Sequence, residues 1–154
     1  MTLILMRHAE AEHGRPDQLR VLTDTGRKEA ATRAMSMAAH AILPEYVVTS
    51  TARRTQETAD LVTQTLRVDV PVHTDETLYT GNETDYLLSI SRVHESFRTV
   101  LLIGHNPTIS LLATLFAGYS VPFSPADAVY CRLPVDTWAE LALSGSDRVE
   151  VLHL

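Results

Sequence analysis

Histidine and arginine residues follow three short apolar runs of the sequence. In chain order they are Arg7 and His8, Arg53 and Arg54, and His105. Guanidinium groups make bidentate, charge-assisted hydrogen bonds to phosphate oxygens. A neutral imidazole can attack phosphorus as a nucleophile, and a second imidazole can stabilise the oxygens of the transferring group. Together these residue types indicate a pocket for a dianionic phosphoryl group, which they could hold and transfer without a metal ion.

The three apolar runs are expected to be strands of one parallel sheet. They are Leu3–Met6, Tyr46–Val48 and Val100–Ile103. Continuous apolar runs without polar alternation are typical of strands that crossover helices cover on both faces. In open α/β sheets, ligands bind beyond the carboxyl ends of the strands. We therefore expect the histidines and arginines to lie side by side, with the N-terminus of the helix after His105 directed at them.

The rest of the chain predicts helices between these strands and antiparallel strands after them. The expected helices are Thr25–Ala41 (capped by Asp24 or Thr25), Arg53–Thr65, Glu83–Phe97 and Pro107–Phe116. Proline in Val70–Val72 favours a strand at a sheet edge. Later strands are expected at Ala128–Leu133, Trp138–Leu143 and Val149–Leu152, paired through bends at residues 134–136 and 144–146. This order predicts a three-layer α/β/α sandwich with a mixed, mostly parallel central sheet.

Length and composition limit the class of protein. The chain has 154 residues, of which 45% are hydrophobic and 21% charged, and this predicts one globular domain. A formal net charge of −6 is unfavourable for binding nucleic acid or an anionic membrane surface, so neither is an expected partner. The single cysteine, Cys131, fits a reducing cytosol, and we expect a cytoplasmic protein.

Other catalytic motifs are not supported. The segment 8–13 contains two histidines and two glutamates but lacks the helical i, i+4 histidine pair of zinc proteases, so no metal site is expected. Thr137 stands where a cysteine-dependent phosphatase loop starting at Cys131 would place its anion-binding arginine. Neither a G-x-S-x-G nor a Walker motif occurs in the sequence.

Four motifs resemble those of the histidine phosphatase (phosphoglycerate mutase-like) superfamily. They are Leu5–Ala9, Arg20–Gly26, Ser50–Ala59 and Gly104–Pro107. The first resembles the Arg-His-Gly signature with Ala9 in place of glycine, and the third has Thr51 in place of proline. The last is similar to the His-Asn-Pro form of the short, SixA-like phosphohistidine phosphatases. The resemblance implies a single histidine phosphatase domain over residues 1–154 with the phosphoglycerate mutase-like fold.

The resemblance also implies a role for each matching residue. His8 would be the nucleophile that carries the phosphoryl group as a transient phosphohistidine. The groups that hold the substrate would be Arg7, Arg54, His105 and Asn106. Arg53 falls on a variable position of the motif. No cofactor and no metal are expected from the family.

The segment Asp75–Glu83 departs from the family pattern for the general acid. Larger members carry a proton-donating glutamate two residues after a leucine, and here that place is held by Thr80. Nearby substitutes are Glu76, Glu83 and Asp85, among which the sequence does not choose. An alkoxide leaving group needs a general acid, whereas an imidazole can depart already protonated. The departure therefore favours a phosphoramidate such as phosphohistidine over a sugar phosphate.

These observations predict a metal-independent phosphatase that acts on phosphohistidine in proteins through a covalent intermediate on His8. The chain is too short for large lids, so we expect an open, shallow pocket that a side chain of another protein could enter. A phosphatase for small phosphate esters is the enzymatic alternative. A non-catalytic module that binds phosphate or a phosphoprotein is the other alternative, against which the presence of His8 argues. The sequence predicts neither the phosphorylated partner nor the oligomeric state.

Overall fold

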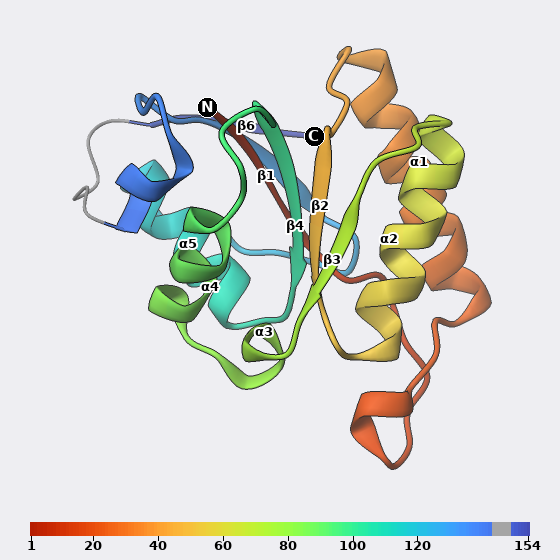
Figure 1. Cartoon of the computed structure of the whole chain (residues 1–154). Helices are drawn as coiled ribbons and strands as arrows, with labels where there is room; N and C mark the ends of the chain where they lie inside the picture. The colour runs from red at the N-terminus through yellow and green to blue at the C-terminus, as the bar shows by residue number, and fades with distance from the viewer. Residues whose placement is uncertain (143–148) are drawn as a thin grey trace.

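The computed structural model describes residues 1–142 and 149–154. These residues form a central six-stranded sheet with helices on both sides (Figure 1). Its strands are β1 (Thr2–Arg7), β2 (Tyr46–Ser50), β3 (Val72–Asp75), β4 (Thr99–Gly104), β5 (Ala128–Arg132) and β6 (Glu150–His153). They lie in the order β3-β2-β4-β1-β5-β6. The first four are mutually parallel, whereas β5 is antiparallel to β1 and β6. The predicted mixed, mostly parallel sheet is confirmed, with β3 at an edge.

Helices cover both faces of the sheet. One face carries α1 (Asp24–Ala39) and α2 (Arg53–Leu66), and the other carries α3 (Thr77–Thr80), α4 (Glu83–Ser91) and α5 (Thr108–Ala117) (Figure 1). Alternate residues of β1 show why both faces need covering: Leu3 and Leu5 belong to the core under α4 and α5, and Ile4 and Met6 to the core under α1 and α2. All four side chains are fully buried. The predicted α/β/α sandwich is therefore confirmed, and none of the described helices has the length and apolar character to cross a membrane.

The strand register brings three carboxyl ends to the same edge of the sheet. Arg7, the last residue of β1, pairs with Gly104, the last residue of β4. On the other side of β4, Ile103 pairs with Thr49, one residue before the end of β2. The chain segments that leave these three strands therefore start beside one another.

Three predicted elements differ in the structure. The strand expected at Trp138–Leu143 is wrong, because residues 138–142 form a 3-10 helix, η2 (Trp138–Ala142). The Trp138 side chain is fully buried, and its indole N–H donates to the Phe97 carbonyl at 2.7 Å. The apolar residues of this segment therefore reflect one anchored tryptophan and not the alternating buried face of a strand. Leu143 and the predicted bend at residues 144–146 lie outside the described residues.

The helix expected over Glu83–Phe97 ends at Ser91. Its apolar spacing continues because Val93, held in a turn by a bond to the Ile90 carbonyl, still packs on the core. The first helix is capped by Thr23 and not by Asp24 or Thr25. The Thr23 hydroxyl accepts a bond from the Gly26 N–H, which satisfies one of the free donors of the first turn.

Candidate active site

Most of the residues singled out in the sequence line one cavity of about 390 Å³ at the carboxyl edge of the sheet. Its lining residues are Arg7, His8, Asp17, Arg20, Arg54, Tyr79, Thr80, His105 and Asn106. Arg53 is not among them: its exposed side chain pairs with Glu57 at 3.0 Å. A second cavity, also of about 390 Å³, shares Arg7, His8 and Arg20 with the first. The second cavity therefore adjoins the first along the segment that follows β1.

His8 presents an unprotonated ring nitrogen to the cavity. Its Nδ1 lies 2.7 Å from the Ala9 carbonyl oxygen, which can only accept, so Nδ1 carries the proton. Its Nε2 lies 3.3 Å from Nε of Arg54, which can only donate, so Nε2 keeps its lone pair. Burial, with the charges of Arg54 and Arg7, lowers the pKa of His8 to about 4. A neutral imidazole with a fixed tautomer is the form that can act as a nucleophile.

The guanidinium of Arg54 lies between the two imidazoles. Besides the contact with His8, its Nη2 is 3.3 Å from Nδ1 of His105, and the two rings are 5.2 Å apart between centroids. Arg54 is 6% exposed, although it lies in the first turn of α2. The other side of its guanidinium is held by Asp17, through the backbone carbonyl at 2.9 Å and the carboxylate at 3.1 Å. The guanidinium is therefore fixed on all sides before any ligand binds.

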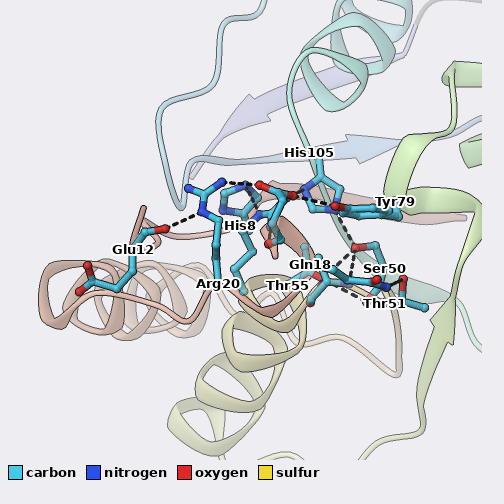
Figure 2. Close-up of polar contacts among 12 residues, drawn as sticks. His8, Glu12, Gln18, Arg20, Ser50, Thr51, Thr55, Tyr79 and His105 are labelled. Carbon is cyan, nitrogen blue, oxygen red and sulfur yellow. Dashed lines mark hydrogen bonds and ion pairs between the residues drawn. The ribbon is translucent and has the colours of Figure 1, made fainter. Parts of the chain in front are cut away.

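His105 is held in place by hydrogen bonds to residues of β2 and α4. Its Nδ1 faces Arg54 Nη2, which can only donate, so Nε2 carries the proton. Nε2 therefore donates to the Ser50 hydroxyl at 2.7 Å (Figure 2). Its backbone N–H donates to the Tyr86 hydroxyl at 3.1 Å. A Cβ on the preceding Gly104 would lie 2.5 Å from the Tyr86 ring, so only glycine allows this close approach. Burial, with His8 and Arg54 close by, lowers the pKa of His105 to about 3.

Arg7 carries a buried donor without a partner. Its Nη1 donates to the Phe123 carbonyl at 3.0 Å, and the amide of Asn106 donates to the same oxygen at 3.0 Å. Arg7 Nε has no hydrogen-bond partner among the described residues. An unsatisfied buried donor costs about 1–3 kcal/mol, and more when the group is charged. Since Arg7 lines the cavity, an anion bound there would lie beside this guanidinium and balance its charge, which fits a phosphoryl group.

The carboxylates considered as proton donors lie away from the cavity. Glu76 precedes α3 and is exposed, Glu83 begins α4 and is half-buried, and neither is among the lining residues. Asp85 accepts a bond from the Asn82 N–H in the capping box of α4. Thr80, at the place of the family's glutamate, does line the cavity. The structure thus brings together Arg7, His8, Arg54, His105 and Asn106, and does not bring Glu76 or Glu83 to them.

Sequence reasoning missed three residues of the cavity wall. Asp17 lies in a 3-10 turn, η1 (Asp17–Leu19), and its carboxylate accepts from Arg20 at 2.8 Å and from the Tyr79 hydroxyl at 2.7 Å. Tyr79 packs edge-on against the His105 ring, with centroids 5.8 Å apart. The spacing of Asp17 and Arg20 could have predicted their ion pair, because residues three apart can meet in a helical turn. Nothing in the sequence marked Tyr79.

Metal binding finds no support in the described geometry. Within residues 1–142 and 149–154, no three His, Cys, Asp or Glu side chains come together as a metal ion would require. The cavity walls are instead dominated by arginine and neutral histidine, which suit an oxyanion.

Comparison with known proteins identifies the family. Residues 3–86 match the family model of the histidine phosphatase superfamily (branch 1). An uncharacterized protein of Mycobacterium tuberculosis is 30% identical over 143 residues, which cover 91% of this chain and 88% of that protein. The chain therefore belongs to the histidine phosphatase superfamily, and this membership supports phosphatase activity.

Solved structures give a finer likeness. A SixA protein from Nakamurella multipartitia, described as a phosphohistidine phosphatase, superposes with a TM-score of 0.79 at 27% identity and covers 99% of this chain and 95% of its own. The protein histidine phosphatase SixA complexed with tungstate has a TM-score of 0.80 at 20% identity, over 99% of this chain and 94% of its own. The fold is thus that of the short, SixA-like members of the superfamily.

Proposed function

We propose that the protein is a metal-independent phosphatase that removes phosphoryl groups from phosphohistidine side chains of other proteins. The observation that carries the proposal is the state of His8 in the cavity: its ring is neutral, and its unprotonated Nε2 accepts a hydrogen bond from Arg54 Nε. The superfamily membership and the likeness to SixA proteins support the same assignment.

In the first step, the phosphoryl group binds in the cavity that His8, Arg54 and His105 line. Its oxygens accept from the guanidinium groups of Arg54 and Arg7 and from the Asn106 amide, all of which line the cavity. His8 Nε2 attacks phosphorus, the bond between phosphorus and the substrate nitrogen breaks, and its electron pair returns to that nitrogen. Positive charge then develops on the His8 ring, which the bond from Nδ1 to the Ala9 carbonyl stabilises.

In the second step, water hydrolyses the phosphohistidine on His8. The water oxygen bonds to phosphorus and one water proton passes to a phosphoryl oxygen, while the P–Nε2 bond breaks and its electron pair returns to His8. Inorganic phosphate leaves and the neutral imidazole is restored. Arginine positions and charge neutralisation supply what this reaction needs, because phosphoryl transfer depends mainly on alignment and electrostatics.

The nature of the cavity favours a nitrogen leaving group. An alkoxide needs a neutral acid beside it, and neither Glu76 nor Glu83 lines the cavity. An imidazole can leave as a neutral ring if it enters protonated on its second nitrogen. The open cavity also admits a side chain that is attached to a large partner.

The test compares purified enzyme on a phosphohistidine peptide and on sugar and nucleotide phosphates. We expect kcat/KM for the phosphohistidine peptide to exceed the others by about tenfold or more, since the missing acid penalises only esters. Brief incubation with labelled substrate and acid-free quenching should leave label on the wild type and none on His8→Ala. A higher rate on sugar phosphates would instead establish a phosphatase for small esters, and a His8→Ala variant with the wild-type rate would reject the nucleophile.

A further inference from the structure

The cavity wall contains one carboxylate, Asp17, that the steps above do not use. Its Oδ2 accepts from Arg54 Nη2 at 3.1 Å and from the Tyr79 hydroxyl at 2.7 Å, and its Oδ1 accepts from Arg20 Nη1 at 2.8 Å. Two carboxylate oxygens offer about four acceptor sites. Three are in use and the side chain is 48% exposed, so acceptor capacity remains on the cavity side.

Asp17 is fixed as an anion. Hydrogen bonds from Arg20 and Tyr79 hold the pKa of the Asp17 carboxyl well below its usual range. It therefore has no proton to give to a leaving group, and a general acid role is excluded. What it can do in the cavity is accept a hydrogen bond and stabilise a positive charge.

The position of Asp17 relative to His8 suggests which part of the substrate it meets. The Arg54 guanidinium separates the two: its Nε lies by His8 at 3.3 Å, and its Nη2 by Asp17 at 3.1 Å. In an in-line displacement the leaving group departs on the side of phosphorus opposite the nucleophile. Arg20 and Tyr79, the other partners of Asp17, lie on either side of the two imidazoles in the close-up (Figure 2). A leaving group that points away from His8 can reach the Asp17 carboxylate, because both side chains line the same cavity.

We propose that Asp17 accepts a hydrogen bond from the second ring nitrogen of the substrate phosphohistidine and keeps that nitrogen protonated while the P–N bond breaks. The inference rests on the proposed function. The His8 Nε2–P bond forms as the substrate P–N bond breaks, and the electron pair goes to the substrate nitrogen. The ring enters with a positive charge and leaves as neutral imidazole, with its proton still on the nitrogen that faces Asp17. The enzyme donates no proton, so the step balances without a general acid.

This role makes Asp17 a specificity-determining residue. A phosphate ester has no N–H at the corresponding place, and its leaving oxygen gains negative charge near the Asp17 carboxylate. A fixed anion therefore favours the phosphoramidate and disfavours the ester at the same point of the reaction.

The decisive variant is Asp17→Asn, which keeps the shape of the side chain and removes its charge. We measure kcat/KM on a phosphohistidine peptide and on p-nitrophenyl phosphate, whose leaving group departs without acid assistance. The ratio of the two values should fall by about tenfold or more, because a hydrogen bond to a charged acceptor is lost on one substrate only. Both values come from the same preparation, so the ratio does not depend on the fraction of folded enzyme.

A pH profile adds a second measurement. The charged and titratable groups that line the cavity around Asp17 are Arg7, His8, Arg20, Arg54, Tyr79 and His105. Burial lowers the pKa values of both histidines well below 7, so the alkaline limb of kcat/KM on the peptide reports loss of the substrate ring proton. In Asp17→Asn this limb should move to lower pH, because the bound ring loses the carboxylate that stabilises its proton.

Asp60→Asn is the matched control, since it removes the same charge from an exposed place on α2 outside the cavity and should leave ratio and profile unchanged. Equal losses on both substrates in Asp17→Asn would show that the carboxylate only orients Arg54 and would overturn the inference alone. An unchanged ratio would overturn it too. A wild type that cleaves the ester and not the peptide would refute the proposed function, and the inference with it.

Discussion

The two walls of the cavity are built in different ways. One wall consists of strand ends, with Arg7, His8 and His105 leaving β1 and β4 next to Ser50 at the end of β2. Its polar side chains are buried or half-buried, and each makes a hydrogen bond to another side chain or to the backbone. The other wall consists of two short turns, η1 and α3, which contribute Asp17 and Tyr79. We therefore propose that the strand-end wall binds the phosphoryl group common to all substrates, and that the turn wall contacts the leaving group attached to it.

Arg54 joins the two walls, and its replacement should have the largest effect. Arg54→Lys keeps the positive charge but removes the planar group that contacts His8, His105 and Asp17 together. We expect kcat/KM to fall by about 10²- to 10³-fold on phosphohistidine and ester substrates alike, as for the loss of a preorganised oxyanion donor. Steady-state kinetics on both substrates tests this. A loss confined to one substrate would mean that Arg54 acts on the leaving group and not on the phosphoryl group.

Ser50→Ala should lower kcat/KM equally on substrates with different leaving groups. The variant removes the acceptor of the His105 Nε2 proton and so frees the tautomer and the orientation of that ring. A fall in kcat/KM of roughly tenfold, equal on phosphohistidine and ester, is expected because a small misplacement of a reacting group is costly. Thr49→Val on the same strand is the control, since its buried hydroxyl has no partner among the described residues. Unequal losses would place His105 on the leaving-group side of the comparison.

The strand-end wall also makes stability depend on pH. His8 and His105 have pKa values lowered to about 4 and about 3 in the folded chain, chiefly by burial, whereas an unfolded histidine titrates near pH 6.5. Between these values the unfolded chain binds more protons than the folded one, so the free energy of unfolding should fall as the pH drops from about 6.5 to 4. Denaturant titrations at several pH values measure this. A His8→Asn, His105→Asn double variant should lose much of the slope, and an unchanged slope would mean that other groups cause it.

The same contrast explains what the sequence could predict. Each residue of the strand-end wall follows an apolar run, so a parallel sheet alone is enough to bring Arg7, His8 and His105 together. The turn wall has no such signal, because η1 and α3 are single turns whose position depends on packing against α2, β2 and α4. The sequence did indicate that Thr80 holds the place of the family's glutamate, and Thr80 does line the cavity. It did not indicate that the neighbouring Tyr79 hydroxyl donates to Asp17.

Arg53→Ala should have the smallest effect on activity and is the reference against which the loss in Arg54→Lys is compared. Arg53 and Arg54 are adjacent in the sequence, but helical geometry turns them to different sides of α2, and only Arg54 lines the cavity. Arg53 is exposed and pairs with Glu57, which Arg27 also contacts at 3.3 Å, so the carboxylate keeps a partner in the variant. We expect kcat/KM within about twofold of wild type and a loss of stability below about 1 kcal/mol, as for a surface ion pair. A large loss of activity on the peptide alone would place Arg53 in the docking of the phosphorylated partner, outside both walls of the cavity.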